Sequence, residues 1–265
     1  MKLPISVFII ARDEADRIPE AIIAVRDWVD EVHVVDSGST DDTVAVSAAL
    51  GAVTHFRAWT GYGEQKVYGE GLCRNDWLLN VDADEAVSPA LAWEIQALFA
   101  QGAPPCDAYR VPILPLYPFQ ESGHPWTAFH RPVRLYRKAV AGFDASPVHD
   151  TVRERPGRSP IRTGTLRGHV IHRSFRSLTH HVDKVNRYSS AQAEDRYDKG
   201  RDPSVWTLML TPPLAFLKSF LLRREFANGV DGVIVSYMYA FQRFIRLAKT
   251  RERFRLAGRT RKPAS

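Results

Sequence analysis

The stretch DWLLNVDADE, residues 76–85, changes character at its midpoint. Its first half is apolar enough to form a strand buried in a sheet, whereas its second half places Asp82, Asp84 and Glu85 within four positions. Bringing carboxylates together without a cation is costly, because each negative charge disfavours the ionised form of its neighbour. The stretch therefore predicts a core strand that ends at a site requiring negative charge.

Strand-like and helix-like stretches alternate around this segment. Residues 5–11 are nearly uniformly apolar, as expected for a strand buried on both faces, and further strands are predicted at 31–36 and 53–59. The helix predicted after the acids begins with Ser88 as a cap and Pro89 in its first turn. This alternation predicts a mainly parallel α/β sheet with helices on both faces.

Acidic residues follow three of the predicted strands. Asp13 and Glu14 come after the first strand, Asp36 ends the second, and Asp82 and Asp84 follow the fourth. In open parallel sheets the ligand site lies in the crevice beyond the carboxyl ends of the strands. We therefore expect these acids to converge on one crevice.

Two interpretations stay open for the acids after the fourth strand. Asp82 and Asp84 suit a hard divalent cation such as Mg²⁺ or Mn²⁺, which prefers oxygen ligands and shares phosphate oxygens with a substrate. The alternative is a solvated acidic turn before a helix N-terminus, where acids are also favoured. This alternative applies to Glu85 as well.

Length and composition bound the possibilities. The 265 residues allow one large domain or one domain with an appendage, and an apolar fraction of 45% is enough for a substantial core. Cys73 and Cys106 match no metal-binding spacing, which fits a reducing compartment. The short apolar run after Lys2 ends in charge, so we expect a first strand there and not a signal peptide.

The pattern changes after Pro104. Strand-like stretches at residues 107–114, 131–138 and 168–175 are separated by loops rich in proline and aromatic residues, and a polar helix is predicted over 177–199. We expect the three strands to form a mixed extension of the sheet that closes one side of the crevice.

Positive charge is concentrated near the C-terminus. Residues 243–262 contain nine basic residues and one acid, Glu252, so this tail carries +8 whereas the whole chain carries +6. A segment with such an excess of positive charge suits an anionic surface such as phospholipid, lipopolysaccharide phosphate or nucleic acid. The alternative is a solvated helical face.

Two apolar stretches accompany the basic tail. Residues 205–222 are interrupted by Pro212, Pro213 and Lys218, and a clean membrane span needs about 20 apolar residues without such breaks, so we expect an interfacial hairpin or a broken amphipathic helix. Further on, an apolar helical stripe opposes a basic face, which is typical of helices on anionic bilayers; an ordinary core helix is the alternative. The stripe comprises Ile234, Tyr237, Met238, Phe241, Phe244, Ile245 and Ala248.

Three motifs together resemble family 2 glycosyltransferases of the GT-A fold. They are VFIIARDEADRI at residues 7–18, VVDSGSTDDT at 34–43 and LLNVDADE at 78–85, in this order and spacing. The resemblance covers roughly residues 4–200 and implies an α/β fold with a Rossmann-like, mainly parallel mixed sheet flanked by helices. We expect a glycosyltransferase domain over residues 1–200 and a helical, basic, membrane-associating segment over 201–265.

Three further stretches narrow the resemblance. They are GYGEQKVYG at residues 61–69, SPVHDTV at 146–152 and GHVIHRSF at 168–175. This set is similar to bacterial lipopolysaccharide core β-1,4-glucosyltransferases. It implies an inverting, metal-dependent enzyme that moves glucose from UDP-glucose to a heptose of the lipid-linked lipopolysaccharide inner core. Such an enzyme would be cytoplasmic and peripheral on the inner face of the bacterial inner membrane.

The resemblance also implies which residues hold the donor nucleotide. Asp36 would hydrogen-bond the uracil ring, and Ala11, Arg12 and Glu14 would lie near the nucleotide. Lys66 stands where a cation would meet the phosphates, with a helix-surface lysine as the alternative.

The same resemblance implies a metal site. Asp82 would approach the ribose and the metal, and Asp84 would bind the Mg²⁺ or Mn²⁺ that bridges the diphosphate. His172 would supply a later metal or diphosphate contact, with a satisfied core histidine as the alternative. Arg131 and Arg134 would meet phosphate or lie on a strand surface.

An acceptor-side base completes the predicted chemistry. Expelling a diphosphate from the anomeric carbon builds negative charge, which a metal ion and basic residues stabilise, while a carboxylate takes the proton of the attacking hydroxyl. Asp150 is the first candidate and Asp144 the second. Related sequences usually carry glutamate in place of Asp150, which otherwise would be a turn acid or a partner of Arg153. His149 beside it orients the acceptor or caps a turn.

Other functions are weighed against this one. Another sugar nucleotide or a polyprenyl-phosphate acceptor would leave the same acid motifs. A nucleic-acid-binding protein, suggested by the basic tail, requires aromatic and basic residues interleaved on a platform; the basic residues instead follow an apolar stripe, so we expect no nucleic-acid partner. A dinucleotide-dependent oxidoreductase needs G-x-G-x-x-G after the first strand, where this chain has ARDEAD at residues 11–16.

Overall fold

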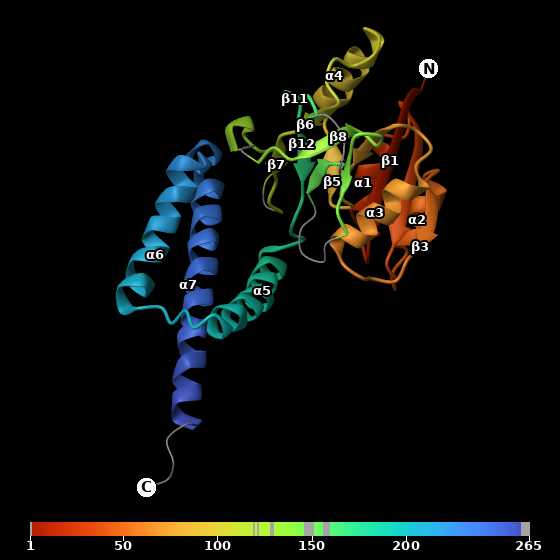
Figure 1. Ribbon diagram of the computed structural model, residues 1–265. Coiled ribbons are helices and arrows are strands. Elements are labelled where there is room, and N and C mark those ends of the chain that lie inside the picture. Colours follow the sequence, from red (N-terminus) through yellow and green to blue (C-terminus); the bar gives the residue numbers. More distant parts are fainter. Residues whose placement is uncertain are drawn as a thin grey trace. The chain divides into compact units, whose positions relative to one another are not determined.

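The computed structural model describes residues 2–118, 120, 122–127, 130–145, 151–155 and 160–260. By its internal packing the chain forms two compact units. The first unit comprises Met1–Pro115 and Ala128–Arg173, and the second comprises Leu116–Thr127 and Ser174–Ser265. The functional boundary expected at residue 200 stays a prediction. Figure 1 carries the element labels used below.

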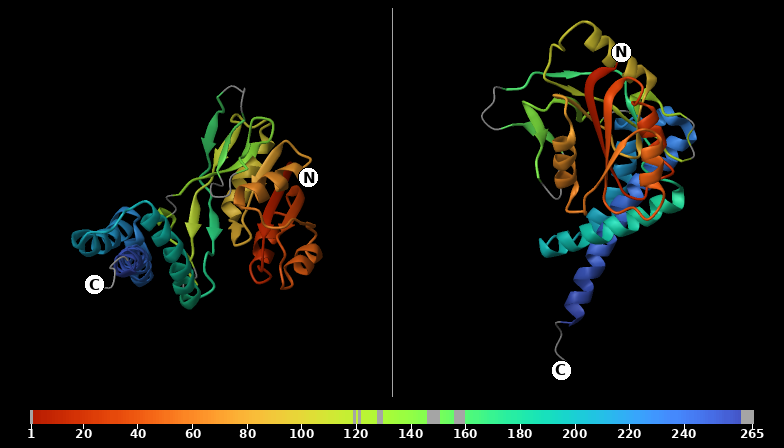
Figure 2. Two further views of the ribbon diagram at one scale, coloured as in Figure 1. Left: turned by 60° about the horizontal axis from the view of Figure 1, so that its bottom comes forward. Right: turned by 90° about the vertical axis from the view of Figure 1, so that its right-hand side faces the viewer.

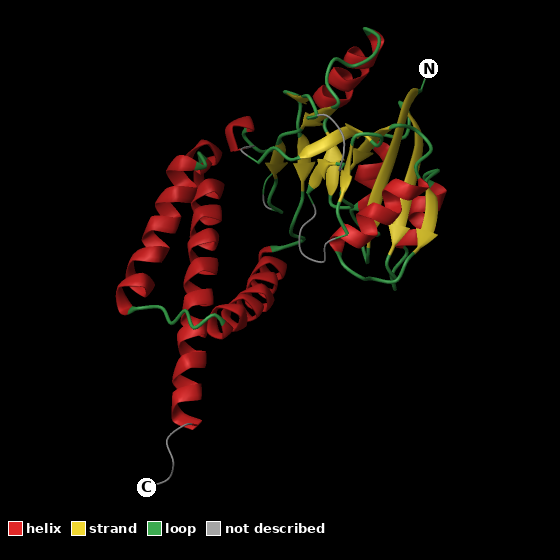
Figure 3. Cartoon of the chain, in the orientation of Figure 1, coloured by secondary structure: helices red, strands yellow, loops and turns green. Residues whose placement is uncertain are grey.

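A seven-stranded sheet forms the centre of the first unit, in the order β11-β6-β8-β4-β1-β2-β3. Its strands are β1 (Leu3–Ala11), β2 (Val29–Asp36), β3 (Val53–Phe56), β4 (Trp77–Asn80), β6 (Ala108–Arg110), β8 (Val133–Arg137) and β11 (Thr163–Thr165). β8 runs antiparallel to its neighbours β4 and β6, and the other pairs are parallel. The mainly parallel α/β sheet predicted from the sequence is confirmed (Figure 3).

β1 is buried on both faces, as its uniformly apolar sequence predicts. Ile5, Val7 and Ile9 belong to the core on one side of the sheet, whereas Phe8 belongs to the core on the other side. The first core is covered by helices whose apolar faces meet it. These are α1 (Ile18–Ile23), α2 (Thr43–Ala49) and α4 (Pro89–Ala100).

The helix α3 (Tyr62–Leu72) packs against β1, β2 and the short strand β9 (Ala141–Phe143). At Gly69 this helix comes so close to β1 that an added Cβ atom would lie 2.8 Å from the ring of Phe8. A side chain at this position would therefore push the helix away from the sheet. Glycine, although unfavourable within a helix, is required here by the close approach.

A smaller sheet follows the acidic turn. It has the order β5-β12-β7, with β5 (Glu85–Val87) antiparallel and β7 (Ile113–Pro115) parallel to β12 (Val170–His172). Its register places His172 opposite Glu85, so the C-terminal part of this unit meets the acidic turn. β9 pairs separately with β10 (Val152–Glu154).

One predicted strand has a different extent in the structure. Residues 107–114 form two strands, β6 and β7, which belong to different sheets. Pro112 lies between them and has no N–H to donate to a ladder, so a single continuous strand is unfavourable there. The expected mixed extension is present in part: β6 and β8 lengthen the main sheet, whereas the strand predicted at residues 168–175 forms β12 of the smaller sheet.

All regular structure described in the second unit is helical (Figure 3). It comprises η1 (Pro125–Thr127), α5 (Leu178–Asp198), α6 (Val205–Leu217), η2 (Lys218–Leu222), η3 (Glu225–Asn228) and α7 (Gly229–Thr260). α5 and α6 both pack on α7, and Figures 1 and 2 show α6 alongside α7. This is the C-terminal helical region predicted from the sequence.

The apolar stretch at residues 205–222 is helical throughout. α6 continues through Pro212 and Pro213, and the helix changes at Lys218 into the π-helical turn η2. The prolines therefore do not end the helix, although each removes one backbone donor. By length and composition, Val205–Leu222 is the one helix in the described part of the chain that would suffice to cross a membrane, and 11% of this window is buried.

Candidate active site

The carboxyl ends of β1, β2 and β4 lie side by side, because β1 is the middle strand of the three. The register sets Ala11 level with Asp36, and it sets Phe8 level with Asn80, two residues before Asp82. The acid-bearing loops therefore leave the sheet from one edge, as a parallel topology requires.

Asp36 organises the loop after β2. Its buried carboxylate accepts hydrogen bonds from the N–H groups of Gly38 (2.8 Å) and Ser39 (3.0 Å) and from the Ser39 hydroxyl. The Ser39 hydroxyl also accepts a hydrogen bond from the N–H of Asp13 at 2.9 Å. Asp13, at a positive φ of 54°, accepts in turn from the N–H of Thr40 at 2.7 Å. The loops after β1 and β2 thus hold each other in place.

Glu14 is connected to the acidic turn through Arg17, a residue that the sequence analysis did not select. The Glu14 carboxylate accepts two hydrogen bonds of 2.6 Å from the Arg17 guanidinium. Arg17 also donates to the backbone carbonyl of Arg173 at 2.8 Å and lies 3.6 Å from the carboxylate of Asp84. The spacing of an acid and an arginine three residues apart at a helix start is the sequence signal for this pair.

Asp84 and His172 are brought together although they lie 88 residues apart in the sequence. His172 Nε2 is 3.3 Å from Asp84 Oδ2. Burial alone would raise the pKa of Asp84, but the hydrogen bond and charge of His172, together with Arg17, hold this pKa below its usual value. Burial would lower the pKa of His172, but Asp84, with Glu85 and Asp82, raises it. His172 therefore belongs to the acid cluster and not to the apolar core.

Asp82 faces two cations. Its carboxylate lies 3.0 Å from Lys66 Nζ and 3.0 Å from the guanidinium of Arg134, which also donates to Asn80 Oδ1 at 2.7 Å. Burial alone would raise the pKa of Asp82, but Lys66 and Arg134 hold it far below its usual value. Lys66 is only 1% exposed, so it is not a helix-surface lysine.

Glu85 is a structural anchor of the acidic turn. Its side chain is buried, accepts a 2.5 Å hydrogen bond from Arg134 and a 3.0 Å hydrogen bond from the N–H of Asp82. Burial raises the pKa of Glu85 above its usual value, and Arg134 opposes this effect. The solvated turn considered for Glu85 is therefore wrong, because its side chain is buried and paired with Arg134 on β8.

The residues fit a divalent cation that takes some of its ligands from the protein and others from a bound substrate. Among the described residues, no three or more His, Cys, Asp or Glu side chains are gathered in a way that would form a closed metal cage. Mg²⁺ is usually held by one or two carboxylates together with substrate phosphates. Asp84 and its neighbour His172 supply such a partial set. Asp82 faces Lys66 and Arg134, so its sharing of one ion with Asp84 stays a prediction.

The structure describes Asp144, one of the two candidates for the base. Asp150 and its neighbour His149 fall at residues 146–150, outside the described part of the chain. Asp144 follows β9, is exposed, and lies 3.4 Å from the Arg153 side chain on β10. Its ion pair with Arg153 is solvated, and its role as a base stays a prediction.

The remaining predicted contacts are divided between the surface and the interior. Arg12 is exposed and lies 3.8 Å from the carboxylate of Asp13. Arg131 is exposed just before β8, whereas Arg134 on the same strand points into the acid cluster. Ala11 is buried at the end of β1.

Glu70 is a second residue that the sequence analysis did not select. It is buried one helical turn after Lys66 on α3, and it accepts hydrogen bonds from the Tyr136 hydroxyl and from the N–H of Phe143 at 3.0 Å. Arg155 lies 3.4 Å away. Burial raises the pKa of Glu70, and these hydrogen bonds oppose the shift. α3 thus contacts the acidic turn through one side chain and the β9–β10 hairpin through another.

A mainly parallel sheet with acidic loops at its strand ends and buried cations beside them is typical of the GT-A fold. Comparison with known proteins gives the family. The model of glycosyl transferase family 2 matches residues 6–141. The chain belongs to this family and is a glycosyltransferase.

Relatives match over nearly the whole chain. An uncharacterized glycosyltransferase of Rickettsia felis is 41% identical over 253 residues, covering 94% of this chain and 89% of the relative. The lipopolysaccharide core biosynthesis glycosyltransferase LpsC of Rhizobium meliloti is 30% identical over 270 residues, covering 97% and 96%. Glucosyl-3-phosphoglycerate synthase from Mycobacterium tuberculosis, crystallised with Mn²⁺ and UDP-glucose, matches 43% of each chain at 25% identity with a TM-score of 0.33.

Proposed function

We propose that this enzyme transfers a hexose, glucose from UDP-glucose, with inversion to a heptose of the lipopolysaccharide inner core. The similarity to LpsC over 97% of the chain supports the place of the acceptor in core biosynthesis. The observation that carries the proposal is the approach of Asp84 to His172 beside two buried cations, Lys66 and Arg134.

The loop after β2 suits recognition of a uracil ring. A carboxylate has about four acceptor positions, and the Asp36 carboxylate uses three of them on Gly38 and Ser39. The remaining position on Asp36 would accept the ring N–H of the donor. Because its other contacts fix the carboxylate, Asp36 would be oriented before the nucleotide binds.

The acidic turn suits a diphosphate. Asp84 and His172 would hold a Mg²⁺ or Mn²⁺ ion, which when bound stabilises the charge that develops on the leaving diphosphate. Asp82 would stand between the ribose and Lys66, whose ammonium group it already orients. Arg134 favours the ionised form of Asp82 and holds both Asp82 and Glu85 in place, so that these carboxylates do not rearrange when the donor binds.

The acceptor hydroxyl requires a base. Asp150 would take its proton, and Asp144 is the second candidate for this role. A substitution of the true base spares donor binding but stops transfer. Asp150→Asn and Asp144→Asn, compared for UDP-glucose binding and for transfer to a heptose acceptor, distinguish the two residues.

A donor screen tests the proposed chemistry. Purified protein should hydrolyse or transfer UDP-glucose with Mn²⁺ or Mg²⁺ and lose this activity with a chelator. Asp84→Asn should lower turnover by about 100- to 1,000-fold, the effect typical of losing one electrostatic contact to the transition state. Asp76→Asn is the control, because Asp76 pairs with Arg137 at the other end of β4. Equal activity of the Asp84 and Asp76 variants, or full activity with chelator, would refute the proposal.

The location proposed for this enzyme is the inner face of the bacterial inner membrane, where it would bind peripherally. Two features of the second unit support this location: the large exposed apolar side chains of α6 and η2, and the +8 tail. In sedimentation with vesicles, the full chain should bind anionic lipid more strongly than zwitterionic lipid, and salt should weaken the difference. A protein that stays in the supernatant with both vesicles would exclude this location.

A further inference from the structure

An apolar groove lies between α6 and α7. It has a volume of about 490 Å³, and all its lining residues are apolar or aromatic. Five of them are exposed: Pro213, Leu217, Tyr237, Phe241 and Phe244. Monomeric proteins rarely expose a continuous surface of this kind without a ligand or partner for it. The full lining is Pro212, Pro213, Phe216, Leu217, Tyr237, Ala240, Phe241 and Phe244.

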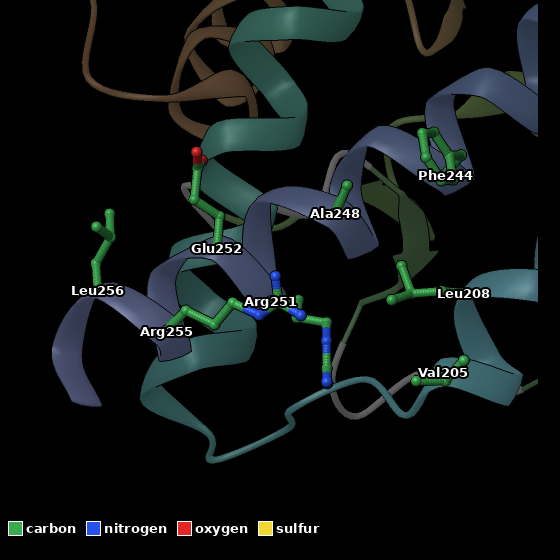
Figure 4. A pocket seen from close by; sticks show the side chains of 8 residues that line it. All are labelled: Val205, Leu208, Phe244, Ala248, Arg251, Glu252, Arg255 and Leu256. Atoms are coloured by element: carbon green, nitrogen blue, oxygen red, sulfur yellow. The ribbon is translucent and has the colours of Figure 1, made fainter. Parts of the chain in front are cut away.

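A second hollow continues the groove along α7. Its volume is about 540 Å³, and it shares Phe244 with the apolar groove. Towards its far end the lining changes from Val205 and Leu208 to two arginines, Arg251 and Arg255 (Figure 4). The combined groove is therefore apolar at one end and cationic at the other.

The two arginines differ in the contacts that their guanidinium groups make within the protein. Arg251 donates to the carbonyl of Pro203 at 2.9 Å and lies 3.5 Å from the carboxylate of Asp202. Arg255 is exposed and forms no ion pair with any residue that the structure describes. Glu252 also lines the hollow, but in Figure 4 its side chain points to the opposite side of α7 from that of Arg251. Arg255 is therefore the cation available to an anionic group.

The length of the groove fits an acyl chain with its headgroup. From Tyr237 to Arg255 the helix rises about 27 Å, at about 1.5 Å per residue. One leaflet of a bilayer is about 15 Å of hydrocarbon. Phe244 lies about 17 Å of helix rise before Arg255, so a lipid whose phosphate lies beside Arg255 can place an acyl chain of this length against Phe244.

We propose that the groove between α6 and α7 binds one phosphate-bearing lipid, with an acyl chain against Phe241 and Phe244 and the phosphate against Arg255. This inference rests on the membrane location proposed above and makes it more specific: the second unit does not only adhere to a charged surface, it withdraws a single lipid chain from it. The bound lipid would cover exposed aromatic side chains that no described part of this unit covers.

Native mass spectrometry of the full chain in detergent tests the site. Phosphatidylglycerol is titrated against diacylglycerol with the same acyl chains and against glycerol phosphate. We expect one phosphatidylglycerol per chain, bound at least about tenfold more tightly than diacylglycerol, because a charge-assisted hydrogen bond to the phosphate is missing in the latter. Glycerol phosphate alone should not be retained.

Two arginine substitutions form a matched pair. Arg255→Gln should weaken retention of phosphatidylglycerol about tenfold. Arg253→Gln removes the same charge from the same helix, but Arg253 pairs with Glu194 at 2.7 Å outside the groove, so retention should not change. Ala240→Phe fills the apolar end and should also reduce retention, provided that circular dichroism shows an unchanged helix content.

Three results would overturn the site. They are equal retention of phosphatidylglycerol and diacylglycerol, equal effects of the Arg255 and Arg253 substitutions, and a dimer that excludes lipid. Hydrolysis of UDP-glucose by the Arg255 variant separates this inference from the proposed function, because Arg255 lies outside the donor site. A chain that binds lipid but does not hydrolyse the donor refutes only the enzyme proposal, and the reverse result refutes only the lipid site.

Discussion

The two compact units differ in where they place charged and large apolar side chains. In the first unit, Lys66 and Glu85 are only 1% and 3% exposed, and each has a partner of opposite charge. In the second unit, Trp206 and Leu222 are 71% and 76% exposed. In α6 and η2 such exposed apolar side chains follow one another within a single helical stretch, and a continuous apolar surface of this kind depends on something else to cover it.

Removing a buried cation from the first unit should have the largest effect. Arg134→Met leaves the buried Glu85 and the partly buried Asp82 beside each other with one cation fewer, and it should lower the free energy of unfolding by about 3–5 kcal/mol. Urea denaturation measures the change. Arg137→Met on the same strand is the control, because its partly exposed pair with Asp76 should contribute less than about 1 kcal/mol. Similar losses in both variants would show that the pairing of Arg134 with Asp82 and Glu85 contributes no more to stability than the partly exposed pair of Arg137 and Asp76.

The contact between α3 and the sheet should be the next most sensitive feature. Gly69→Ala places a Cβ atom 2.8 Å from the Phe8 ring and should destabilise the protein by about 1–3 kcal/mol. Gly71→Ala on the same helix meets nothing within 4 Å, so it should be neutral or slightly stabilising. Thermal unfolding of the two variants compares them directly. A neutral Gly69→Ala would mean that the helix can shift away from β1 at little cost.

The second unit should show an acid-dependent loss of stability. His181 stacks on Phe175 with ring centroids 3.7 Å apart, and burial, with Lys184 and His180 nearby, lowers the pKa of His181 to about 4. The unfolded chain therefore binds more protons between pH 4 and the ordinary histidine value of about 6.5. Stability should be constant above this range and should fall as the pH falls through it.

A pair of phenylalanine substitutions tests this pH dependence. His181→Phe should remove it, because no proton is then taken up at that position on unfolding. His180→Phe should retain it, since burial, the main cause of the low pKa of His181, is unchanged in this variant. The measurement is the urea midpoint between pH 4 and 7.5. An unchanged slope in His181→Phe would assign the pH dependence to other groups.

The smallest effect expected concerns the two thiols of the first unit. Both cysteines are free, but Cys73 is buried whereas Cys106 is partly exposed. Burial raises the pKa of Cys73 to about 12, with the nearby charge of Glu31 adding to the effect. At pH 8 an alkylating reagent should therefore label Cys106 first, as intact mass would show. Rapid labelling of Cys73 in the folded protein would indicate that this core opens readily.

The succession of strands and helices up to β4 and the edge that carries the acids were predictable from the sequence. An apolar run such as residues 5–11 requires burial on both faces, and acids at successive strand ends must share an edge of a parallel sheet. The approach of His172 to Asp84 was anticipated only through the family resemblance. No local pattern fixes the pairing of β12 with β5, because this pairing depends on contacts between distant segments.

Other parts of the site could not be read from local pattern. Lysine and glutamate are usually surface residues. Lys66 and Glu85 are buried here because Lys66 pairs with Asp82 and Glu85 pairs with Arg134. The helix through Pro212 and Pro213 likewise follows from packing along α7, which local propensity does not include.

The two contacts made by α3 restrict how this segment can vary in length. Lys66 meets Asp82, and Glu70, one turn later, meets Tyr136 and the β9 backbone. One residue inserted between them would rotate Glu70 by about 100° around the helix axis and break one of the two contacts. Insertions and deletions among homologues should therefore fall before Tyr62 or after Leu72, and the spacing between this lysine and this glutamate should be constant within the family.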